Sequence, residues 1–269
     1  MPKFAKAETQ AKNVIKGLTK TKHIKSLGTA RNYMQSLKTV ASWSKDIGIN
    51  GIQAMSIEQA RMYLDYRAEI VGQKTLDMER QAIQAMMQFN GKLQPKKTLY
   101  RVKSLLEEIK RSRAYTPEQA QAISRRQTVK HELATQLAYA AGLRAHELLT
   151  LSKASERPPN NRPALDSKWR GRSGELYTVA GKGGLIRHVL IPNHLVDQLE
   201  AKKLKQPITV TDREINYLQH YDIGGGKKWS DSFSKASNRT LLFSTGAHGL
   251  RHSYAQERMV ELNVLGFKY

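Results

Sequence analysis

Apolar residues recur at helical spacing through the first third of the chain, which predicts a series of amphipathic helices. We expect Thr29 to be the N-cap of the first of them. Ser56 and Gln59 have the spacing of a capping box at the start of the second. A third should begin at Thr75 and end before Gly91, since glycine commonly follows the last turn of a helix. Packed together, the apolar faces of these helices would form one helical domain.

The pattern weakens in residues 92–113, which carry 8 basic side chains around a short apolar stretch at Leu105 and Ile109. We interpret this stretch as a short helix within a linker between domains. The chain is therefore divided into residues 1–112, which include the linker, and residues 113–269.

Strand character appears in the second half. Residues 153–173 are polar and rich in proline and arginine, which predicts a surface loop. Residues 176–179 and 186–191 have strand composition, and Gly-Lys-Gly-Gly at 181–184 supplies the turn of a β-hairpin. Helices are expected on both sides of the hairpin, with N-caps at Thr116 and Asn193. The predicted fold class is mainly α with a small β-hairpin, an α+β fold.

The chain is strongly basic. Its 45 Lys and Arg side chains exceed its 23 Asp and Glu side chains by 22. Residues 1–113 hold 22 basic and 9 acidic side chains, a balance of +13, so residues 114–269 carry the remaining +9. An excess in both halves predicts a nucleic acid as partner, because neutralised phosphates release counterions. A membrane surface is disfavoured, since the basic residues do not gather beside one amphipathic anchor, and a small-molecule substrate is not expected.

The absence of cysteine excludes disulfides, thiolate catalysis and cysteine-ligated zinc, and is typical of a reducing compartment. No apolar run approaches the roughly twenty residues that a membrane span requires. The Lys-rich N-terminus lacks the apolar core of a signal peptide. We expect a cytoplasmic protein that associates with the nucleoid.

Two segments carry the candidate chemistry. Residues 141–148 read Ala-Gly-Leu-Arg-Ala-His-Glu-Leu, and residues 248–255 read His-Gly-Leu-Arg-His-Ser-Tyr-Ala. Each places an arginine, Arg144 or Arg251, directly after Gly-Leu. The two arginines could clamp one phosphate, because guanidinium groups present rigid forks of donors that match phosphate oxygens.

A metal-free transfer of a phosphodiester needs more than two cations. Negative charge builds up on the nonbridging oxygens and must meet fixed positive groups, and the leaving oxygen needs a proton donor. Lys182, on the hairpin turn, could extend into a groove as that donor. His248 lies three residues before Arg251 and would share its helical face.

Both segments resemble the two arginine boxes of the tyrosine recombinase (phage integrase) family, which read roughly Gly-Leu-Arg-x-x-Glu-Leu and His-x-Leu-Arg-His-x-x-Ala. The hairpin turn around Lys182 resembles the family's Gly-Lys-Gly hairpin, and the order Arg, Lys, His-x-x-Arg is the family's order. The resemblance covers residues 115–269. Residues 1–112 resemble the family's helical core-binding domain, which clamps DNA, in size, charge and helicity.

The resemblance implies a role for each site residue. Arg144 and Arg251 would hold the scissile phosphate, Lys182 would protonate the 5′ oxygen, and His248 would support the transition state. The remaining residues would support them: Glu147 as a buried partner that orients the arginine or its helix, Arg187 as the basic position after the hairpin turn, and His252 as a packed or hydrogen-bonded structural histidine.

The resemblance also implies the reaction. Such an enzyme would be a site-specific recombinase or integrase that breaks and rejoins double-stranded DNA through a 3′-phosphotyrosyl intermediate, as a homotetramer on DNA. The covalent link conserves the bond energy, so no cofactor and no metal is implied. DNA integration or recombination by a mobile element would be the process served.

The family's nucleophile is a tyrosine well beyond the second arginine box. Tyr254 is three residues from Arg251 on the same expected helix, which is too close to attack a phosphate that this arginine holds. Tyr269 comes too early. We therefore expect the sequence to be truncated before the nucleophile, which would lie beyond Tyr269, so that this chain binds DNA without cleaving it.

Other interpretations remain open. A non-catalytic DNA-binding accessory protein on a recombinase scaffold would need the basic surface and no reactive tyrosine. A type IB topoisomerase would use the same chemistry. Zinc binding by His248 and His252 is disfavoured, because there is no cysteine, no His-Glu-x-x-His pattern, and an arginine lies between them.

Overall fold

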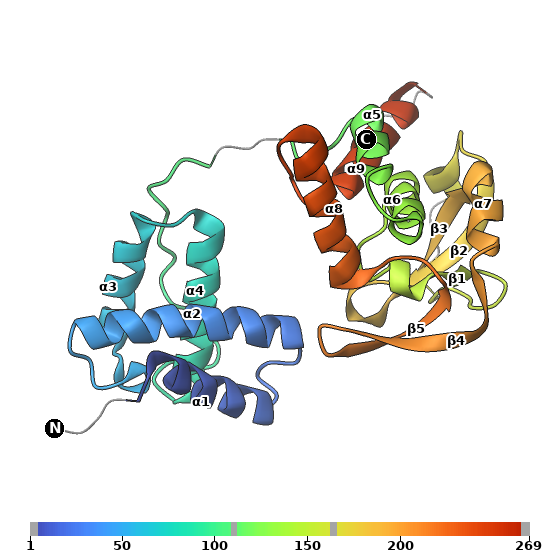
Figure 1. The fold of residues 1–269 in the computed structure, drawn as a ribbon. Coiled ribbons are helices and arrows are strands. Elements are labelled where there is room, and N and C mark those ends of the chain that lie inside the picture. Colours follow the sequence, from blue (N-terminus) through green and yellow to red (C-terminus); the bar gives the residue numbers. More distant parts are fainter. Residues whose placement is uncertain (1–4, 109–111, 162–165, 265–269) are drawn as a thin grey trace. The chain divides into compact units, whose positions relative to one another are not determined.

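The computed structural model of the protein describes residues 5–108, 112–161 and 166–264 and divides into two compact units, Met1–Lys110 and Arg111–Tyr269 (Figure 1). Each unit buries its own cluster of apolar side chains. The fold is mainly helical with small antiparallel sheets, which confirms the predicted fold class. The predicted division at residue 112 into a DNA-clamping domain and a catalytic domain stays a prediction.

Within residues 5–108, the described part of the first unit, four α-helices pack around one core: α1 (Ala7–Lys20), α2 (Leu27–Asp46), α3 (Ile57–Ala68) and α4 (Gln73–Phe89), with a 3-10 turn η1 (Ile52–Ala54) before α3. Amphipathic spacing brings side chains such as Leu18, Leu37, Tyr63 and Met86 into that core, where all four are buried. The predicted capping box is present at α3, with both of its hydrogen bonds formed between Ser56 and Gln59.

The predicted starts of two helices are wrong by a few residues. The hydroxyl of Ser26 accepts from the backbone N–H of Thr29, so Ser26 is the N-cap of α2 and Thr29 lies inside its first turn. Helix α4 begins after Gly72, whose carbonyl accepts from the N–H of Thr75. In both cases a serine or glycine three residues earlier provides the cap, and the helix extends back to it.

The predicted helix near Leu105 is absent from the described part of the linker, and Ile109 lies outside the described residues. Residues 92–108 instead run without regular structure along the first unit and bury Leu93, Leu99 and Val102 in its core. The Gln73 side chain binds this segment at two backbone positions, the carbonyl of Val102 and the N–H of Ser104. Side-chain amides of α4 take up the backbone groups that a helix would have paired internally.

Among the described residues of the second unit are five α-helices and two antiparallel sheets. The helices are α5 (Pro117–Ser124), α6 (Val129–Ala141), α7 (Asn193–Glu200), α8 (Gly226–Leu241) and α9 (His248–Val264). The strands are β1 (Ser152–Lys153), β2 (Gly174–Ala180) and β3 (Ile186–Pro192), which form a sheet of order β1-β2-β3, and β4 (Lys203–Asp212) and β5 (Ile215–Tyr221), which pair with each other. Figure 1 shows α6 and α7 beside the β2–β3 sheet.

The hairpin and most of the helices follow the sequence pattern. Strands β2 and β3 form the predicted hairpin. Their pairing runs from Gly174 opposite Pro192 to Ala180 opposite Ile186, somewhat beyond the predicted strands 176–179 and 186–191. The capping box of Thr116 is also formed. Asn193 is not a cap, because Pro192 takes that position and Asn193 is the first helical residue of α7. The β4–β5 hairpin was not predicted.

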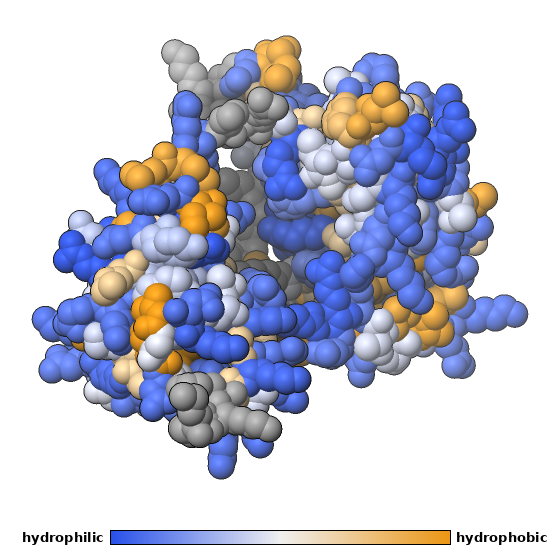
Figure 2. Space-filling model, turned by 60° about the vertical axis from the view of Figure 1, so that its left-hand side comes forward, coloured by the Kyte–Doolittle hydropathy of each residue, from blue (hydrophilic) through white to orange (hydrophobic). Residues whose placement is uncertain are grey.

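The described helices include none that is both long and apolar enough to cross a membrane. Figure 2 shows a visible face that is mostly hydrophilic, with apolar side chains in separate small patches.

Candidate active site

The first arginine box forms a turn whose geometry depends on one glycine. Helix α6 ends at Gly142, which adopts a left-handed conformation with φ of 62°. The chain then reverses so that Glu147 reaches back to Arg144 twice. One carboxylate oxygen accepts the backbone N–H of Arg144 at 2.8 Å, and the other accepts its guanidinium at 2.8 Å.

Glu147 has no exposed surface and gathers three guanidinium groups. Besides Arg144, it accepts a hydrogen bond from Nη2 of Arg187 at 2.7 Å, and Nη1 of Arg251 lies 4.0 Å from the same oxygen. Burial alone would raise the pKa of Glu147, but the charge of Arg187 and the hydrogen bonds from both arginines outweigh it and lower the pKa. The carboxylate is therefore ionised at neutral pH and orients the arginines around it.

Arg251 comes from α9, at a point where this helix touches the end of α6. Its Nη1 donates to the carbonyl oxygen of Gly142 at 2.5 Å. On the opposite face of the helix, Leu250 and Ser253 are buried, and the Ser253 hydroxyl exchanges hydrogen bonds with the backbone of Tyr115. These contacts fix the rotation of α9 and with it the direction of Arg251.

His248 and His252 lie one turn apart on α9, and their rings meet edge to face with centroids 5.1 Å apart. Partial burial, followed by the neighbouring His252 and the positive charges of Arg113, Arg251 and Arg144, lowers the pKa of His248. The ring is therefore neutral at neutral pH, with one nitrogen available to donate a hydrogen bond. Among the described residues there is no group of three or more side chains that could hold a metal ion.

A pocket of about 420 Å³ adjoins this cluster. Positive or titratable groups line much of it, together with an aromatic ring: Lys168, Trp169, Arg187, His248, Arg251 and His252. Arg144 does not line the pocket and joins the cluster through Glu147. Lys182 lies in the turn between β2 and β3, within the short 3-10 segment Lys182–Gly184, and its side chain is outside the described part of the structure.

The fold has close counterparts among solved structures. A site-specific recombinase, XerH, bound to its difH substrate matches at 16% identity over 95% of this chain and 74% of that chain, with a TM-score of 0.54. A lambda integrase tetramer bound to a Holliday junction matches at 15% identity over 94% of this chain and 70% of that chain, with a TM-score of 0.57. The Tn1549 transposon integrase in complex with transposon right end DNA matches at 13% identity over 96% of this chain and 88% of that chain, with a TM-score of 0.55. The chain has the tyrosine recombinase fold.

The likeness lies in the three-dimensional structure. No protein-family model and no curated protein matches this sequence. The short arginine boxes and the hairpin were therefore the sequence features from which the recombinase fold could be identified.

Lys168 and Trp169 also line the arginine-lined pocket and were not among the site residues predicted from the sequence. Both lie in a 3-10 turn, η3 (Asp166–Trp169), within the stretch that we expected to be a surface loop. Nζ of Lys168 donates to the carbonyl oxygen of His188 at 3.1 Å and lies 4.3 Å from the centroid of the Trp169 ring. A single lysine in a polar, Arg-rich segment gave no periodic or motif signal.

Tyr254 also lines the pocket, but packing occupies its ring. The guanidinium of Arg172 lies 4.9 Å from the ring centroid. On the other side the ring lies so close to Gly142 that a Cβ atom there would be 2.6 Å from its Cδ1. This environment agrees with a structural role for Tyr254 in the recombinase fold.

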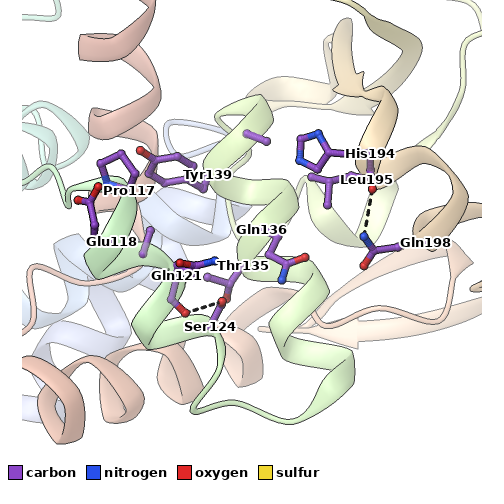
Figure 3. A pocket seen from close by; sticks show the side chains of 12 residues that line it. Pro117, Glu118, Gln121, Ser124, Thr135, Gln136, Tyr139, His194, Leu195 and Gln198 are labelled. Atoms are coloured by element: carbon purple, nitrogen blue, oxygen red, sulfur yellow. Dashed lines mark hydrogen bonds between the residues drawn. The ribbon is translucent and has the colours of Figure 1, made fainter.

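A larger pocket, of about 490 Å³, lies elsewhere on the second unit, between α5, α6 and α7 (Figure 3). Its lining combines apolar side chains with glutamines, Glu118, Tyr139 and His194, and includes no lysine or arginine. A site for a phosphate needs fixed positive charge, so the smaller arginine-lined pocket is the candidate active site of the recombinase-like unit.

Proposed function

We propose that this protein is a site-specific DNA recombinase of the integrase type, which transfers DNA strands through a 3′-phosphotyrosyl intermediate. One observation carries the proposal: a buried carboxylate, Glu147, gathers Arg144, Arg187 and Arg251 beside a pocket that His248 also lines. Ion pairs with a purely structural role also bring charged groups together, but in such a pair the charges balance. Here three guanidinium groups surround a single carboxylate. The excess of positive charge suits a phosphate.

We assign each residue of the candidate site a role in this reaction. Arg144 and Arg251 would hold the nonbridging oxygens of the scissile phosphate, where negative charge grows in the transition state. Neutral His248 would donate a hydrogen bond to one of these oxygens. Lys182, on the turn between β2 and β3, would give a proton to the leaving 5′ oxygen. A tyrosine hydroxyl would attack the phosphorus, and the packing of Tyr254 argues against this residue as the nucleophile.

Double-stranded DNA is the proposed partner. Residues 1–110 hold 20 basic and 9 acidic side chains, and residues 111–269 hold 25 basic and 14 acidic ones, so each unit alone carries a net charge of +11. Structures similar to this one include recombinases bound to DNA, one of them a tetramer on a Holliday junction. We propose that both units contact one duplex and that four protomers assemble on two DNA sites.

The test is a covalent adduct. The protein would be incubated with nicked duplexes that tile the DNA flanking its gene. A denaturing gel would show a protein–DNA band, and mass spectrometry of that band would identify the tyrosine that is joined to DNA. Arg144→Ala and Arg251→Ala should each reduce adduct formation by about a hundredfold or more. Their affinity for DNA should fall much less, because many other phosphates remain bound.

Arg125→Ala is the matched control, since Arg125 is exposed at the end of α5 and lies outside the pocket. It should form the adduct at the wild-type rate. Tight DNA binding without an adduct from any duplex would contradict a recombinase and would support a non-catalytic DNA-binding protein on the same fold. If Arg251→Ala formed the covalent adduct at the wild-type rate, the assigned active site would be contradicted.

A further inference from the structure

One lysine enters the arginine-lined pocket from outside the segments that suggested the site. Lys168 lies in η3, before β2, and lines the pocket together with Arg187, His248 and Arg251. Its side chain is half-buried. No motif and no assignment given above to the recombinase reaction uses this residue.

The backbone around Lys168 is fixed to α9. Nη2 of the buried Arg258 donates to the carbonyl oxygens of Lys168 at 3.0 Å and of Arg170 at 2.6 Å. Glu261, one turn further along α9, pairs with Arg258 and with Arg172, each at 2.7 Å. The same helix that carries His248 and Arg251 therefore holds the turn that carries Lys168.

The side chain of Lys168 is held as well. Nζ donates one of its three protons to the carbonyl oxygen of His188, the residue next to Arg187 on β3, and the ammonium lies over the Trp169 ring. None of the carboxylates on the described residues forms an ion pair with it. Two ammonium protons remain for other acceptors in a pocket that Arg187 and Arg251 also line.

The charge balance of the pocket favours an anion. Burial, then Arg187 and Arg251, lower the pKa of Lys168 to about 8, against a weaker opposing effect of Glu147. One buried carboxylate thus compensates incompletely for the surrounding positive groups. A phosphate in the pocket would supply the missing negative charge and favour the ammonium form.

We propose that Lys168 is a further phosphate-contacting residue of this site, whose ammonium binds the same DNA phosphate as Arg251. This inference rests on the proposed function, because the phosphate is that of the DNA duplex. A phosphate that contacts Lys168 raises the pKa of this lysine, so DNA binding is accompanied by proton uptake near pH 8.

The first test is direct and uses the wild-type chain. In NMR spectra of protein labelled with ¹³C at the lysine Cε, one lysine signal should titrate near pH 8 and be missing from Lys168→Arg. Saturation with a 20-base-pair duplex of random sequence should raise that midpoint by at least one pH unit. A midpoint that stays unchanged with DNA bound, as judged by fluorescence anisotropy of the same samples, overturns the proposal.

The second test measures affinity against pH. If DNA restores the ordinary pKa of Lys168, affinity for the duplex should fall about tenfold between pH 7 and pH 9. Lys168→Arg should remove this fall, because arginine stays protonated. Lys227→Arg should keep it, because Lys227 is exposed and pairs with Asp231 on α8.

Other charged or titratable groups line the same pocket: Arg187, Arg251, His248, His252 and Tyr254. Between pH 7 and pH 9 the guanidinium of Arg251 keeps its charge, Glu147 stays ionised, and His248 titrates at lower pH. If the affinity of Lys168→Arg for DNA falls by the same factor between pH 7 and pH 9, the proposal for Lys168 is overturned. The proposal that the protein binds DNA is not affected by that result. Absence of duplex binding by the wild-type chain at both pH values would instead overturn the proposed function and this inference together.

Discussion

At the scale of single residues, Glu147 has the largest effect on the site. A buried carboxylate is costly unless it is paired, and this one is paired three times, with Arg144, Arg187 and Arg251. Without it, three guanidinium groups would repel one another in a partly buried space. The sequence suggested one orienting contact for Glu147, and the structure adds Arg187 and Arg251 as further partners. That addition depends on strand β3 and helix α9, which no local pattern relates to Glu147.

We expect Glu147→Gln to lower the free energy of unfolding by about 3 kcal/mol, because one partner of a buried ionic network is lost. Urea unfolding monitored by circular dichroism would measure it. Glu175→Gln is the control, since Glu175 forms an exposed pair with Lys153 and its loss should cost about 1 kcal/mol or less. Equal costs for the two variants would contradict the assigned role of Glu147.

The same comparison has a defined pH dependence. The folded-state pKa of Glu147 lies below its ordinary value of 4.5, so its stabilising contribution is complete above that value. The contribution is lost as the pH falls through the folded-state pKa. The difference in stability between wild type and Glu147→Gln should therefore be constant from pH 6 to pH 7 and shrink below pH 4.

At the scale of elements, the site depends on the contact between the end of α6 and the face of α9. Gly142 supplies three features there: a φ of 62°, a carbonyl oxygen for Arg251, and space for the ring of Tyr254. A side chain at this position would be strained by the backbone and would also meet the ring at 2.6 Å. Glycine is required here for two independent reasons.

Gly142→Ala should destabilise the second unit by more than the roughly 1–2 kcal/mol that a left-handed non-glycine residue costs, because the ring must also move. Gly246→Ala is a matched control: its φ is 76°, and the nearest atom to a new Cβ is 3.9 Å away, on the side chain of Arg113. Thermal unfolding of both variants would separate strain from the clash. Identical losses would show that the contact with Tyr254 contributes nothing.

Element by element, the sequence predicted what local chemistry determines. The predictions were correct for the capping box at Ser56, the N-cap at Thr116 and the β2–β3 hairpin, because each is set by residues a few positions apart. The hairpin of β4 and β5 was missed, since most of β4 is exposed and its polar and apolar residues give no clear alternation. Its position depends on contacts with residues far away in the sequence, such as His146, whose ring stacks with that of Tyr217 on β5 at 6.4 Å.

The linker helix was wrong for a related reason. Apolar spacing around Leu105 suggested a helix, but Leu99 and Val102 find their partners in the core of the first unit. Gln73 and Gln84, on α4, bind the backbone of this segment and favour its irregular path. Such side-chain contacts over long sequence distances leave no trace in a local pattern. Lys168 was missed for the same reason, because its contacts with His188 and Arg258 also span long sequence distances.

At the scale of the whole molecule, the positive charge is shared by two units that fold around separate cores. Many of the basic side chains are exposed, and the face drawn in Figure 2 is mostly hydrophilic. Some basic side chains form ion pairs with Asp or Glu, but the basic side chains outnumber the acidic ones by 22. A partner with a regular array of phosphates can neutralise many of these groups at once, and each neutralised phosphate releases counterions.

The affinity for duplex DNA should therefore fall by about a thousandfold or more between 50 and 200 mM salt, as expected for six or more phosphate contacts. Fluorescence anisotropy with a labelled duplex would measure the slope of log affinity against log salt. The unfolding midpoint of the free protein, measured at both salt concentrations, is the control that separates weaker binding from unfolding. Because both units are basic, the slope should exceed that of a single small DNA-binding module. A flat response would mean that the charge excess does not serve phosphate binding, and the case for DNA would then rest on the fold and the arginine pocket alone.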